Sequence, residues 1–428
     1  MTEPLRVALA GLGTVGAGVI KLLDANRELI TRRAGRSIEV VAVSARDRNR
    51  NRDFDMSRFV WVDDPTELAG HGDVVVELIG GSEGTALTLA HNSIAAGKAF
   101  VTANKAMIAH HGLSLATAAE EKGIALKYEA AVAGGIPVIK GLREGAAANE
   151  ITQVYGILNG TCNYILTTME AEGRDFADVL FDAQELGYAE ADPAFDVDGI
   201  DAAHKLSILA SLSFGTRIDF ASVSTIGIRA ILAGDIAQAK ALGFRVRLVG
   251  RAEAVTGGLL QSVQPCLVPV THPLAHVAGA MNAVVAEGNF VGRLFFEGRG
   301  AGEGPTASAV VADLIDIARG EVGPAFAMPV ASLADPGHAE AGSRIGRFYL
   351  RFTVADRPGV LAEITAATRD AGVSIENLIQ RGEAPDGGVL LVMTTHICAE
   401  AAVSDALAKL AGSPSLIGTP MLMPILDV

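Results

Sequence analysis

The sequence predicts an α/β protein in three parts: a domain with a parallel sheet, a larger α+β domain, and a small C-terminal βαββαβ unit. Three observations carry this prediction. Apolar β-rich runs alternate with helix patterns through the first third of the chain, the pattern becomes mixed near residue 134, and a stretch rich in Pro, Gly and Ala precedes the last fifth. Continuous apolar strands separated by helices are typical of a parallel sheet covered on both faces.

The composition supports an ordered protein that binds a small molecule. The 428 residues suffice for two or three domains, and half of them are hydrophobic, so each domain can bury a core. The formal net charge of −14 argues against a nucleic-acid binder, which needs a basic face. Every long apolar stretch is broken before the roughly 18 residues that a membrane-spanning helix needs. We expect no membrane partner.

The N-terminus and the cysteines indicate the compartment. The chain runs from its first residues into a strand pattern, without the basic segment and cleavage site of an export signal, so we expect a cytoplasmic protein. Cys162, Cys266 and Cys398 are scattered and lack CxxC spacing. This argues against a disulfide framework or a structural zinc site.

The first predicted domain covers residues 1–133 and is joined by a returning helix at 304–322. Its helices are expected at 14–29, near 84–96 and over 105–122. Its strands are expected at 5–11, 38–45, 73–80, 99–104 and 124–132.

The turn between the first strand and the first helix has the spacing G-x-G-x-x-G, with Gly11, Gly13 and Gly16. Such glycines permit a tight turn and close approach of a pyrophosphate, whose charge then meets main-chain amides at the N-terminus of a helix. The string alone is weak evidence, but here it follows a strand and opens a helix, as the motif requires. We therefore predict a Rossmann-type dinucleotide-binding domain, with Thr14 and Val15 completing the cofactor-binding loop.

The end of the second strand bears on the choice of dinucleotide. A carboxylate there would hold the ribose 2′-hydroxyl of NAD, but the chain has Ser44, Ala45 and Arg46, followed by further arginines. A guanidinium can pair two oxygens of a 2′-phosphate. Ala45 and Arg46 are thus predicted to contact the cofactor, and NADP is favoured while NAD stays possible. The alternative is a solvated loop in which the arginines have no such role.

The second predicted domain, residues 134–303, mixes helix patterns with β-rich runs at 241–254 and 282–298, which indicates α+β structure. Residues 323–346 are predicted as a linker and residues 347–428 as the βαββαβ unit.

Five carboxylates crowd into twelve positions of the second domain, namely Glu190, Asp192, Asp196, Asp198 and Asp201. Their spacing lacks the pattern of a calcium loop and no histidine pair joins them, so a metal cage is disfavoured. A solvated acidic loop and a proton-handling site remain.

The helix pattern that follows, from residue 200 to 214, is apolar or small nearly all round and so predicts a buried helix. Asp198 is its expected N-cap. Lys205 is the anomaly, and Asp201 lies on the same face at i and i+4. These two residues form either a structural pair that reaches solvent or a buried ammonium poised to move a proton near a nicotinamide. His204 faces another way and is expected to be a core residue.

Several motifs together resemble homoserine dehydrogenases over almost the whole chain. They are GLGTVG, VTANKA at 101–106, EAAVAGGIPVI at 129–139, ILNGTCNYIL at 157–166, GYAEADP with DVDGIDAAHK, and GRGAGEGPTASAVVADLIDIAR at 298–319. The segment DRPGVLAEI at 356–364 resembles the start of an ACT regulatory domain. No aspartate kinase region precedes the first strand, so we expect the monofunctional form.

The resemblance implies reversible NAD(P)-dependent interconversion of L-homoserine and L-aspartate 4-semialdehyde, on the route to threonine, methionine and isoleucine. It assigns proton transfer to Lys205 and substrate binding to Asp201 and Glu190, with Asp196 a further substrate candidate. Lys105 is expected near both substrate and cofactor, so the catalytic set is Lys205, Asp201 and Lys105. Near the nicotinamide end, the resemblance adds Gly187, Glu190 and Gly302 as cofactor contacts. These residues suit the chemistry, because hydride transfer to a carbonyl leaves an alkoxide that an ammonium can protonate.

Two further sites follow from the resemblance alone. The family binds a monovalent cation, usually sodium, which here implies Glu129 and the main-chain oxygens of Val132, Gly134 and Ile136. From the residues themselves, an ordinary turn beside a solvated glutamate is the simpler interpretation. The family also implies a homo-oligomer, dimer or tetramer, that pairs through the middle domain.

In ACT domains, paired units bind an amino acid where the first strand meets the first helix. Asp356, Gly359, Val360 and Leu361 occupy that junction, and Asn377 lies in the next strand. We expect L-threonine as a feedback effector there, with a purely dimerising unit as the alternative. Rival functions for the whole chain are another amino-acid dehydrogenase and a non-catalytic NADP and amino-acid sensor, which would not need a buried Lys205.

Overall fold

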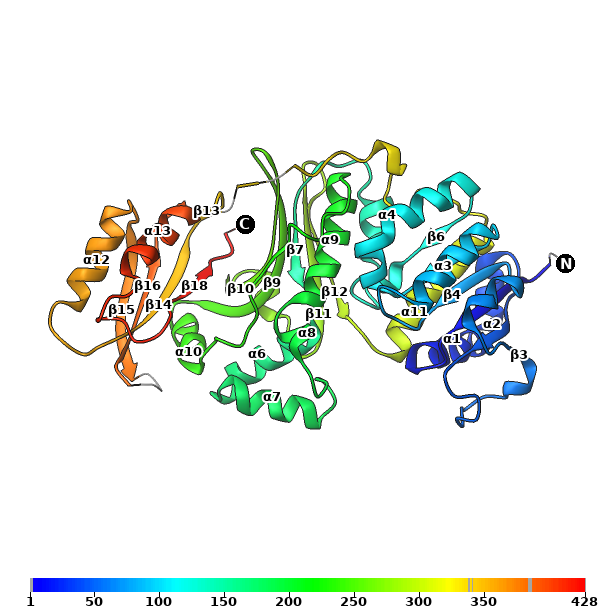
Figure 1. The fold of residues 1–428 in the computed structure, drawn as a ribbon, viewed down its shortest axis with the longest axis horizontal. Helices are drawn as coiled ribbons and strands as arrows, with labels where there is room; N and C mark the ends of the chain where they lie inside the picture. The colour runs from blue at the N-terminus through cyan, green and yellow to red at the C-terminus, as the bar shows by residue number, and fades with distance from the viewer. Residues whose placement is uncertain (1–2, 338, 341, 384–386, 428) are drawn as a thin grey trace.

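The computed structural model describes residues 3–337, 339–340, 342–383 and 387–427. Three parts follow one another along the longest axis of the molecule (Figure 1). The N-terminal domain lies at one end, a domain with a large curved sheet in the middle, and the C-terminal unit at the other end. No described helix combines the length and apolar character needed to cross a membrane.

The N-terminal domain contains a six-stranded parallel sheet in the order β3-β2-β1-β4-β5-β6. Its strands are β1 (Leu5–Ala10), β2 (Ile38–Ser44), β3 (Val60–Trp61), β4 (Val74–Glu77), β5 (Ala99–Thr102) and β6 (Leu126–Lys127). This is the strand order of a Rossmann domain, in which ligands bind at the carboxyl ends of the strands where the order reverses, here between β1 and β4. The predicted Rossmann-type domain is confirmed.

Helices cover both faces of this sheet: α1 (Thr14–Ala25), α2 (Arg27–Ala34), α3 (Thr85–Ala95), α4 (Lys105–Lys122) and the returning α11 (Glu303–Ala318). Two expectations were wrong in detail. The helix expected at 14–29 is divided at Asn26. The strand expected at 124–132 stops after β6, and a 3-10 turn, η3 (Glu129–Ala131), follows. The main chain leaves the sheet there because the Glu129 amide donates to Asp313 of α11.

The middle domain contains a second, mostly antiparallel sheet in the order β12-β11-β7-β9-β10-β8. Its strands are β7 (Ile151–Ile157), β8 (Ser224–Thr225), β9 (Phe244–Val255), β10 (Gly258–Pro269), β11 (Met281–Gly288) and β12 (Gly292–Arg299). The sequence patterns located β9 and the β11–β12 hairpin but missed β7 and β10. Pro265 in β10 lacks an amide hydrogen and argues against a strand from sequence alone.

The helices of the middle domain are α6 (Gly160–Glu172), α7 (Phe176–Glu185), α8 (Ala194–Val197), α9 (Ile200–Phe214) and α10 (Ala233–Ala241). Helix α9 packs on the second sheet and is buried almost throughout, as predicted. Asp198 is not its N-cap, which corrects the sequence prediction. Gly199 takes that position with φ of 88°, a left-handed conformation that glycine adopts without strain.

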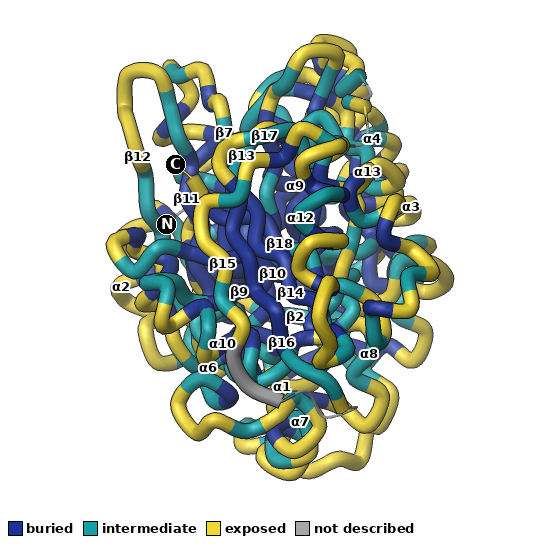
Figure 2. Tube along the Cα trace, turned by 90° about the vertical axis from the view of Figure 1, so that its left-hand side faces the viewer, coloured by how far each residue is buried: buried dark blue, intermediate teal, exposed yellow. Residues whose placement is uncertain are grey.

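The C-terminal unit has the expected βαββαβ order, with a sheet ordered β15-β16-β14-β18. Its elements are β14 (Phe348–Val354), α12 (Val360–Asp370), β15 (Ile375–Glu383), β16 (Val389–Thr395), α13 (Glu400–Leu410) and β18 (Met421–Pro424). Phe348, Leu350 and Phe352 face α12 and α13 in one core. Tyr349 and Met423 belong to the core of the middle domain. The unit is therefore packed onto the middle domain, and buried strands from both lie together in Figure 2.

The stretch 323–346, predicted as a linker, is folded against the rest of the protein. Phe326, Val330 and Leu333 are buried. Arg344 is also buried and donates from Nη2 to Ser262 Oγ of β10 at 2.7 Å. A short pair of strands, β13 (Ile345–Gly346) and β17 (Cys398–Ala399), follows it.

Candidate active site

Two hollows meet at the loop after β1. A groove of about 630 Å³ is lined by the loop itself and the end of β2, and a cleft of about 850 Å³ lies between the N-terminal and middle domains. Gly11 and Gly13 line the groove, whereas Val15 lines the cleft. The glycine loop thus stands where a ligand passing from groove to cleft would contact it.

The three glycines of the loop have distinct reasons to be glycine. Gly11 has φ of +100°, and a Cβ there would lie 2.6 Å from the carbonyl oxygen of Leu78. A Cβ on Gly16 would lie 1.9 Å from the carbonyl oxygen of Gly11. Gly13, the N-cap of α1, has open space where its Cβ would be. Two glycines therefore let the loop fold, and the third leaves room for a pyrophosphate on the amides that begin α1, starting at Thr14.

The groove continues to the end of β2, where Ala45 and Arg46 line it together with Arg50 and Arg52. Arg52 is held by the carbonyl oxygens of Arg50 and Asp47. Arg46 is exposed at the groove. The structure thus places a guanidinium where the sequence predicts contact with the ribose end of the cofactor.

In the cleft, a buried cluster of charges joins residues that are far apart in the sequence. Lys205 Nζ donates to Asp201 Oδ2 at 2.7 Å and to the carbonyl oxygen of Leu158 at 2.8 Å. Lys105 Nζ lies 3.1 Å from Asp201 Oδ1. Asp201 is thus shared by both lysines, one on α9 and one at the start of α4. The structure brings the predicted catalytic residues Lys205, Asp201 and Lys105 together.

The ammonium of Lys205 keeps one donor for a ligand. Lysine has three N–H bonds, and the two contacts above use two of them. Lys205 lines the cleft although only 9 % of the residue is exposed. A ligand oxygen in the cleft can accept the third hydrogen bond in a place that bulk water hardly reaches, where electrostatic effects are strong.

Asn159 connects this cluster to Asp196. Its Nδ2 donates to Asp196 Oδ1 and to Asp201 Oδ2, both at 2.8 Å. Burial tends to raise the pKa of Asp201, but the charges of Lys205 and Lys105 outweigh it and hold that pKa well below its usual range. Burial, followed by the charge of Asp201, raises the pKa of Asp196. The two carboxyl groups thus have environments of opposite kind.

His204 is buried and does not belong to the cleft lining, as expected for a core residue. Its ring stacks on Phe220 at 4.4 Å between centroids, and its Nε2 lies 3.2 Å from Nε2 of His110 on α4. Burial, and then the neighbouring His110, lowers the pKa of His204 to about 4. The pair connects α4 and α9, the helices that carry Lys105 and Lys205.

The loop before α8 contributes only part of what the sequence predicts. Gly187 and Tyr188 line the cleft, and the Thr161 hydroxyl donates to the carbonyl oxygen of Tyr188 at 2.8 Å. Glu190 is exposed and does not belong to the cleft lining. Its carbonyl oxygen accepts a hydrogen bond from the Gln184 side chain.

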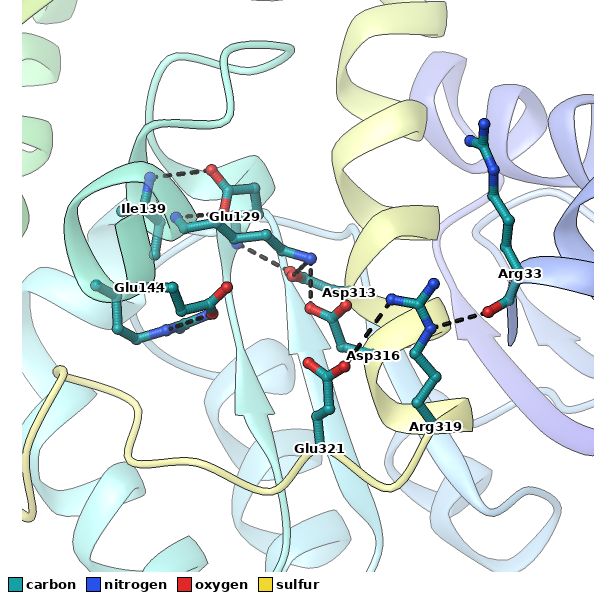
Figure 3. A network of polar contacts seen from close by, with 10 residues as sticks. Arg33, Glu129, Ile139, Glu144, Asp313, Asp316, Arg319 and Glu321 are labelled. Carbon is teal, nitrogen blue, oxygen red and sulfur yellow. Dashed lines mark hydrogen bonds and ion pairs between the residues drawn. The ribbon is translucent and has the colours of Figure 1, made fainter. Parts of the chain in front are cut away.

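The segment predicted to hold a cation forms one wall of the cleft, lined by Ala130, Ala131 and Gly134. Both oxygens of Glu129 accept main-chain amides, from Ile139 at 3.0 Å and Lys140 at 2.9 Å. Figure 3 shows this carboxylate beside the acidic residues of α11. Burial, and then the charge of Asp313, raises the pKa of Glu129 to about 7.

Helix α11 anchors this wall. Asp313 Oδ2 accepts the Glu129 amide at 2.9 Å, and the Lys140 ammonium contacts both Asp313 and Asp316 (Figure 3). Burial raises the pKa of Asp313 to about 6. Gly302, the N-cap of α11, lines the cleft at the other end of the helix.

The left-handed backbone at Ala133 and Gly134 allows the cation segment to fold back toward α11. The remaining predicted ligands, Val132 and Ile136, are buried in the same turn. A set of oxygen donors suits a hard cation. Each oxygen of Glu129 accepts one amide and keeps a second lone pair, so the carboxylate could still contact an ion held by the main-chain oxygens. Within the described residues, no three His, Cys, Asp or Glu side chains are grouped to hold a metal ion.

The predicted effector residues lie in the C-terminal unit, away from the cleft, but they do not all lie together. Asn377 pairs through Thr394 with Tyr349 at the start of β14, whereas the turn of Asp356 and Gly359 follows the other end of that strand, so placing Asn377 beside this turn within one chain is wrong. Asp356 and Gly359 are exposed in the turn between β14 and α12, and Leu361 is 41 % exposed. Val360 is buried at the start of α12. Asn377 Nδ2 donates to Thr394 Oγ1 on the neighbouring strand.

Comparisons with known proteins agree with this architecture. The sequence model described as homoserine dehydrogenase matches residues 137–315, and that of its NAD-binding domain matches residues 11–129. The homoserine dehydrogenase of Pseudomonas aeruginosa is 44 % identical over 95 % of both chains. The chain belongs to the homoserine dehydrogenase family. The ACT model matches residues 348–412.

Solved structures of homoserine dehydrogenases have the same fold. One from Thiobacillus denitrificans superposes with a TM-score of 0.91 at 41 % identity, covering 99 % of both chains. A hyperthermophilic archaeal homoserine dehydrogenase in complex with NADPH has a TM-score of 0.62 at 28 % identity, covering 73 % of this chain and 97 % of its own. As a member of the family, the chain is an oxidoreductase that acts on homoserine, binds a nicotinamide cofactor and carries an ACT regulatory region.

The structure adds residues that the sequence patterns did not assign. Asn159 lies within the motif ILNGTCNYIL, which was given no role of its own, and it bonds both carboxylates of the cleft. Asn282 of β11 lines the cleft and donates to the same Leu158 carbonyl oxygen as Lys205. Arg299 and Thr306 also line the cleft. The motif ILNGTCNYIL contains a signal that could have found Asn159, whereas only the pairing of β11 with β7 brings Asn282 to the cleft.

Proposed function

We propose that the cleft interconverts L-homoserine and L-aspartate 4-semialdehyde with Lys205 as the group that holds and moves the proton at the reacting oxygen. The observation that carries this proposal is a buried ammonium with one unused donor, aimed by Asp201 and the Leu158 carbonyl oxygen. When bound, the nicotinamide supplies or accepts the hydride. The remaining steps belong to the side chains of this chain.

In the direction of reduction, negative charge develops on the aldehyde oxygen as its carbon gains hydride. Lys205 donates a hydrogen bond to that oxygen and then its proton, which yields the hydroxyl of homoserine. In the direction of oxidation, the same nitrogen removes the hydroxyl proton. Asp201 fixes the position of Lys205 and balances its charge, while Lys105 holds the other oxygen of that carboxylate, so little rearrangement accompanies the transfer.

The substrate carries an ammonium group that needs an anion. Asp201 already contacts two lysines, whereas Asp196 accepts a hydrogen bond from the neutral side chain of Asn159 and lies 3.3 Å from the Thr161 hydroxyl. We therefore assign the substrate ammonium mainly to Asp196, with Asp201 beside it. Glu190 is exposed outside the cleft lining, so its predicted contacts with substrate and cofactor would require the loop 186–193 to move.

For the cofactor we propose a preference for NADP. Arg46 at the groove can pair a 2′-phosphate, and the archaeal relative is described in complex with NADPH. We further propose a sodium ion on the main-chain oxygens of Val132, Gly134 and Ile136, next to Glu129, where it would stabilise the cleft wall.

For the ACT region we propose feedback inhibition by L-threonine, bound at the turn of Asp356, Gly359, Val360 and Leu361, without Asn377 of the same chain. Free amides at the start of α12 suit an amino-acid carboxylate. A homo-oligomer paired through the middle domain and a cytoplasmic location stay predictions from the sequence and the family.

Initial rates of nicotinamide reduction test these finer proposals. We expect oxidation of L-homoserine with a lower KM for NADP than for NAD, and inhibition by millimolar L-threonine. L-serine, which is one carbon shorter, is the control substrate and should react poorly. Equal KM values for the two dinucleotides would contradict the NADP preference. Equal rates with and without threonine would contradict the feedback.

A further inference from the structure

The segment Ile226–Asp235, here called the bridge segment, joins the ACT sheet to the acidic part of the active site. At its ACT end, Asp235 is completely buried. Its Oδ1 accepts hydrogen bonds from Tyr349 Oη and Arg351 Nε, both at 2.9 Å. Arg351 also donates from Nη2 to the carbonyl oxygen of Ala230 at 3.2 Å. Strand β14 thus bonds to the bridge segment at two places, Ala230 and Asp235.

At its other end, the bridge segment holds the turn between α8 and α9. Arg229 contacts both oxygens of Asp198, at 2.5 and 3.1 Å. The Ile228 amide donates to the carbonyl oxygen of Val197 at 2.9 Å. A Cβ on Gly227 would lie 2.3 Å from that same oxygen, so the two main chains are in close contact. The turn is therefore held by side-chain and main-chain bonds together.

The places that this segment connects are both proposed binding regions. Asp198 lies between Asp196 and Asp201, and left-handed Gly199 separates it from the first turn of α9. Strand β14 leads directly into the turn that contains Asp356. Five residues, 230–234, separate Arg229, which contacts the α8–α9 turn, from Asp235, and they include the start of α10.

We propose that Arg229, Arg351 and Tyr349 are positioning residues of a relay, through which the placement of β14 in the ACT sheet sets the placement of Asp196 and Asp201 and hence the affinity for homoserine. The inference rests on the proposed assignment of these two carboxylates to the substrate. A displacement of β14 cannot leave Asp235 behind, because it would leave a buried carboxylate without its charged partner, which is strongly unfavourable. The bridge segment therefore moves with β14, and Arg229 transmits this movement to Asp198.

Arg229 provides the first test, because 47 % of its side chain is exposed and its replacement leaves the core intact. In the full-length enzyme, Arg229→Gln should raise the KM for L-homoserine about threefold to tenfold, the size of typical coupling effects. The kcat and the KM for NADP should stay within about twofold. Arg58→Gln is the matched control, because Arg58 also contacts both oxygens of an aspartate, Asp24, but lies in the N-terminal domain. It should leave all three constants unchanged.

Tyr349→Phe provides the test from the ACT side. It removes one hydrogen bond from Asp235 and retains the ring, so the core keeps its shape. We expect a rise of about twofold in the homoserine KM, and less than the product of the two single effects when it is combined with Arg229→Gln. Effects that multiply in the double variant, or a Tyr349→Phe enzyme with the wild-type KM, would overturn the relay.

The substrate assignment is tested separately with Asp196→Asn. If this variant raises the homoserine KM while Arg229→Gln does not, the relay is wrong and the substrate site stands. If Asp196→Asn has the wild-type KM, the substrate assignment is wrong, and the relay through it falls as well. Neither result depends on whether threonine inhibits, because all constants are measured without effector.

Discussion

The cofactor end and the substrate end of the cleft are built in different ways. The proposed cofactor end is a contiguous loop, residues 11–16, where main-chain amides and the absence of side chains would receive a pyrophosphate. The substrate end consists of side chains from α4, α6, α8 and α9 that are far apart in the sequence. A main-chain site can therefore be recognised as a local motif, whereas a side-chain site exists only after the domains have packed.

The largest effect is expected at the substrate end. Lys205→Ala should lower the turnover number by about two to four decades, the usual scale for loss of a general acid and base. Binding of NADP, measured by titration, should persist, because Lys205 does not line the groove to which we assign the adenosine end. Lys122→Ala, at the exposed end of α4, is the control. Full turnover by Lys205→Ala would contradict the view that the substrate end depends on its side chains.

At the cofactor end, two alanine substitutions should separate folding from binding. Gly13→Ala has free space in the empty loop, so thermal stability should hold while the Kd for NADP rises by about tenfold or more, equivalent to about 1.4 kcal/mol. Gly16→Ala would collide with the Gly11 carbonyl oxygen and should lower the Tm as well. Paired measurements of Tm and Kd decide this. Tight binding by the Gly13 variant would show that the phosphate lies elsewhere.

Arg46 is the side-chain exception at the cofactor end. Arg46→Ala should raise the KM for NADP about tenfold, which corresponds to one charge-assisted contact, and leave the KM for NAD unchanged. Arg48→Ala is the control, because Arg48 lies over Trp61 outside the groove lining. A similar loss for both dinucleotides would assign Arg46 a general role in place of recognition of the 2′-phosphate.

The smallest expected effect is a pH dependence of stability that arises from the buried side chain of His204. His204 has a folded-state pKa of about 4, below its usual 6.5, so the unfolded chain binds a proton more readily than the folded one. The contribution of neutral His204 to the free energy of unfolding is complete above about pH 6.5 and is lost as the pH falls toward 4. His204→Gln should therefore flatten the decrease in Tm between pH 6.5 and 4. Exposed His91→Gln should keep the wild-type slope.

Much of the fold was predictable because it depends on local periodicity. The alternation of strands and helices identified the Rossmann domain, and the terminal βαββαβ order identified the ACT region. Strands β7 and β10 were missed, since their stability comes from pairing inside the second sheet and not from a clear pattern. Asp198 was taken for an N-cap because its partner, Arg229, lies on another segment.

The sequence by itself determined the glycine loop, the i and i+4 pairing of Asp201 with Lys205, and the buried character of α9, because each depends on neighbours within one or two turns of chain. Only the tertiary structure decided that Lys105 shares Asp201, that Asn159 joins two carboxylates, and that Glu190 lies outside the cleft lining. It also decided that the ACT sheet is fastened to the active-site turn. Such contacts depend on how separate elements pack, and the spacing of residues along the sequence does not give the distance between side chains on different elements.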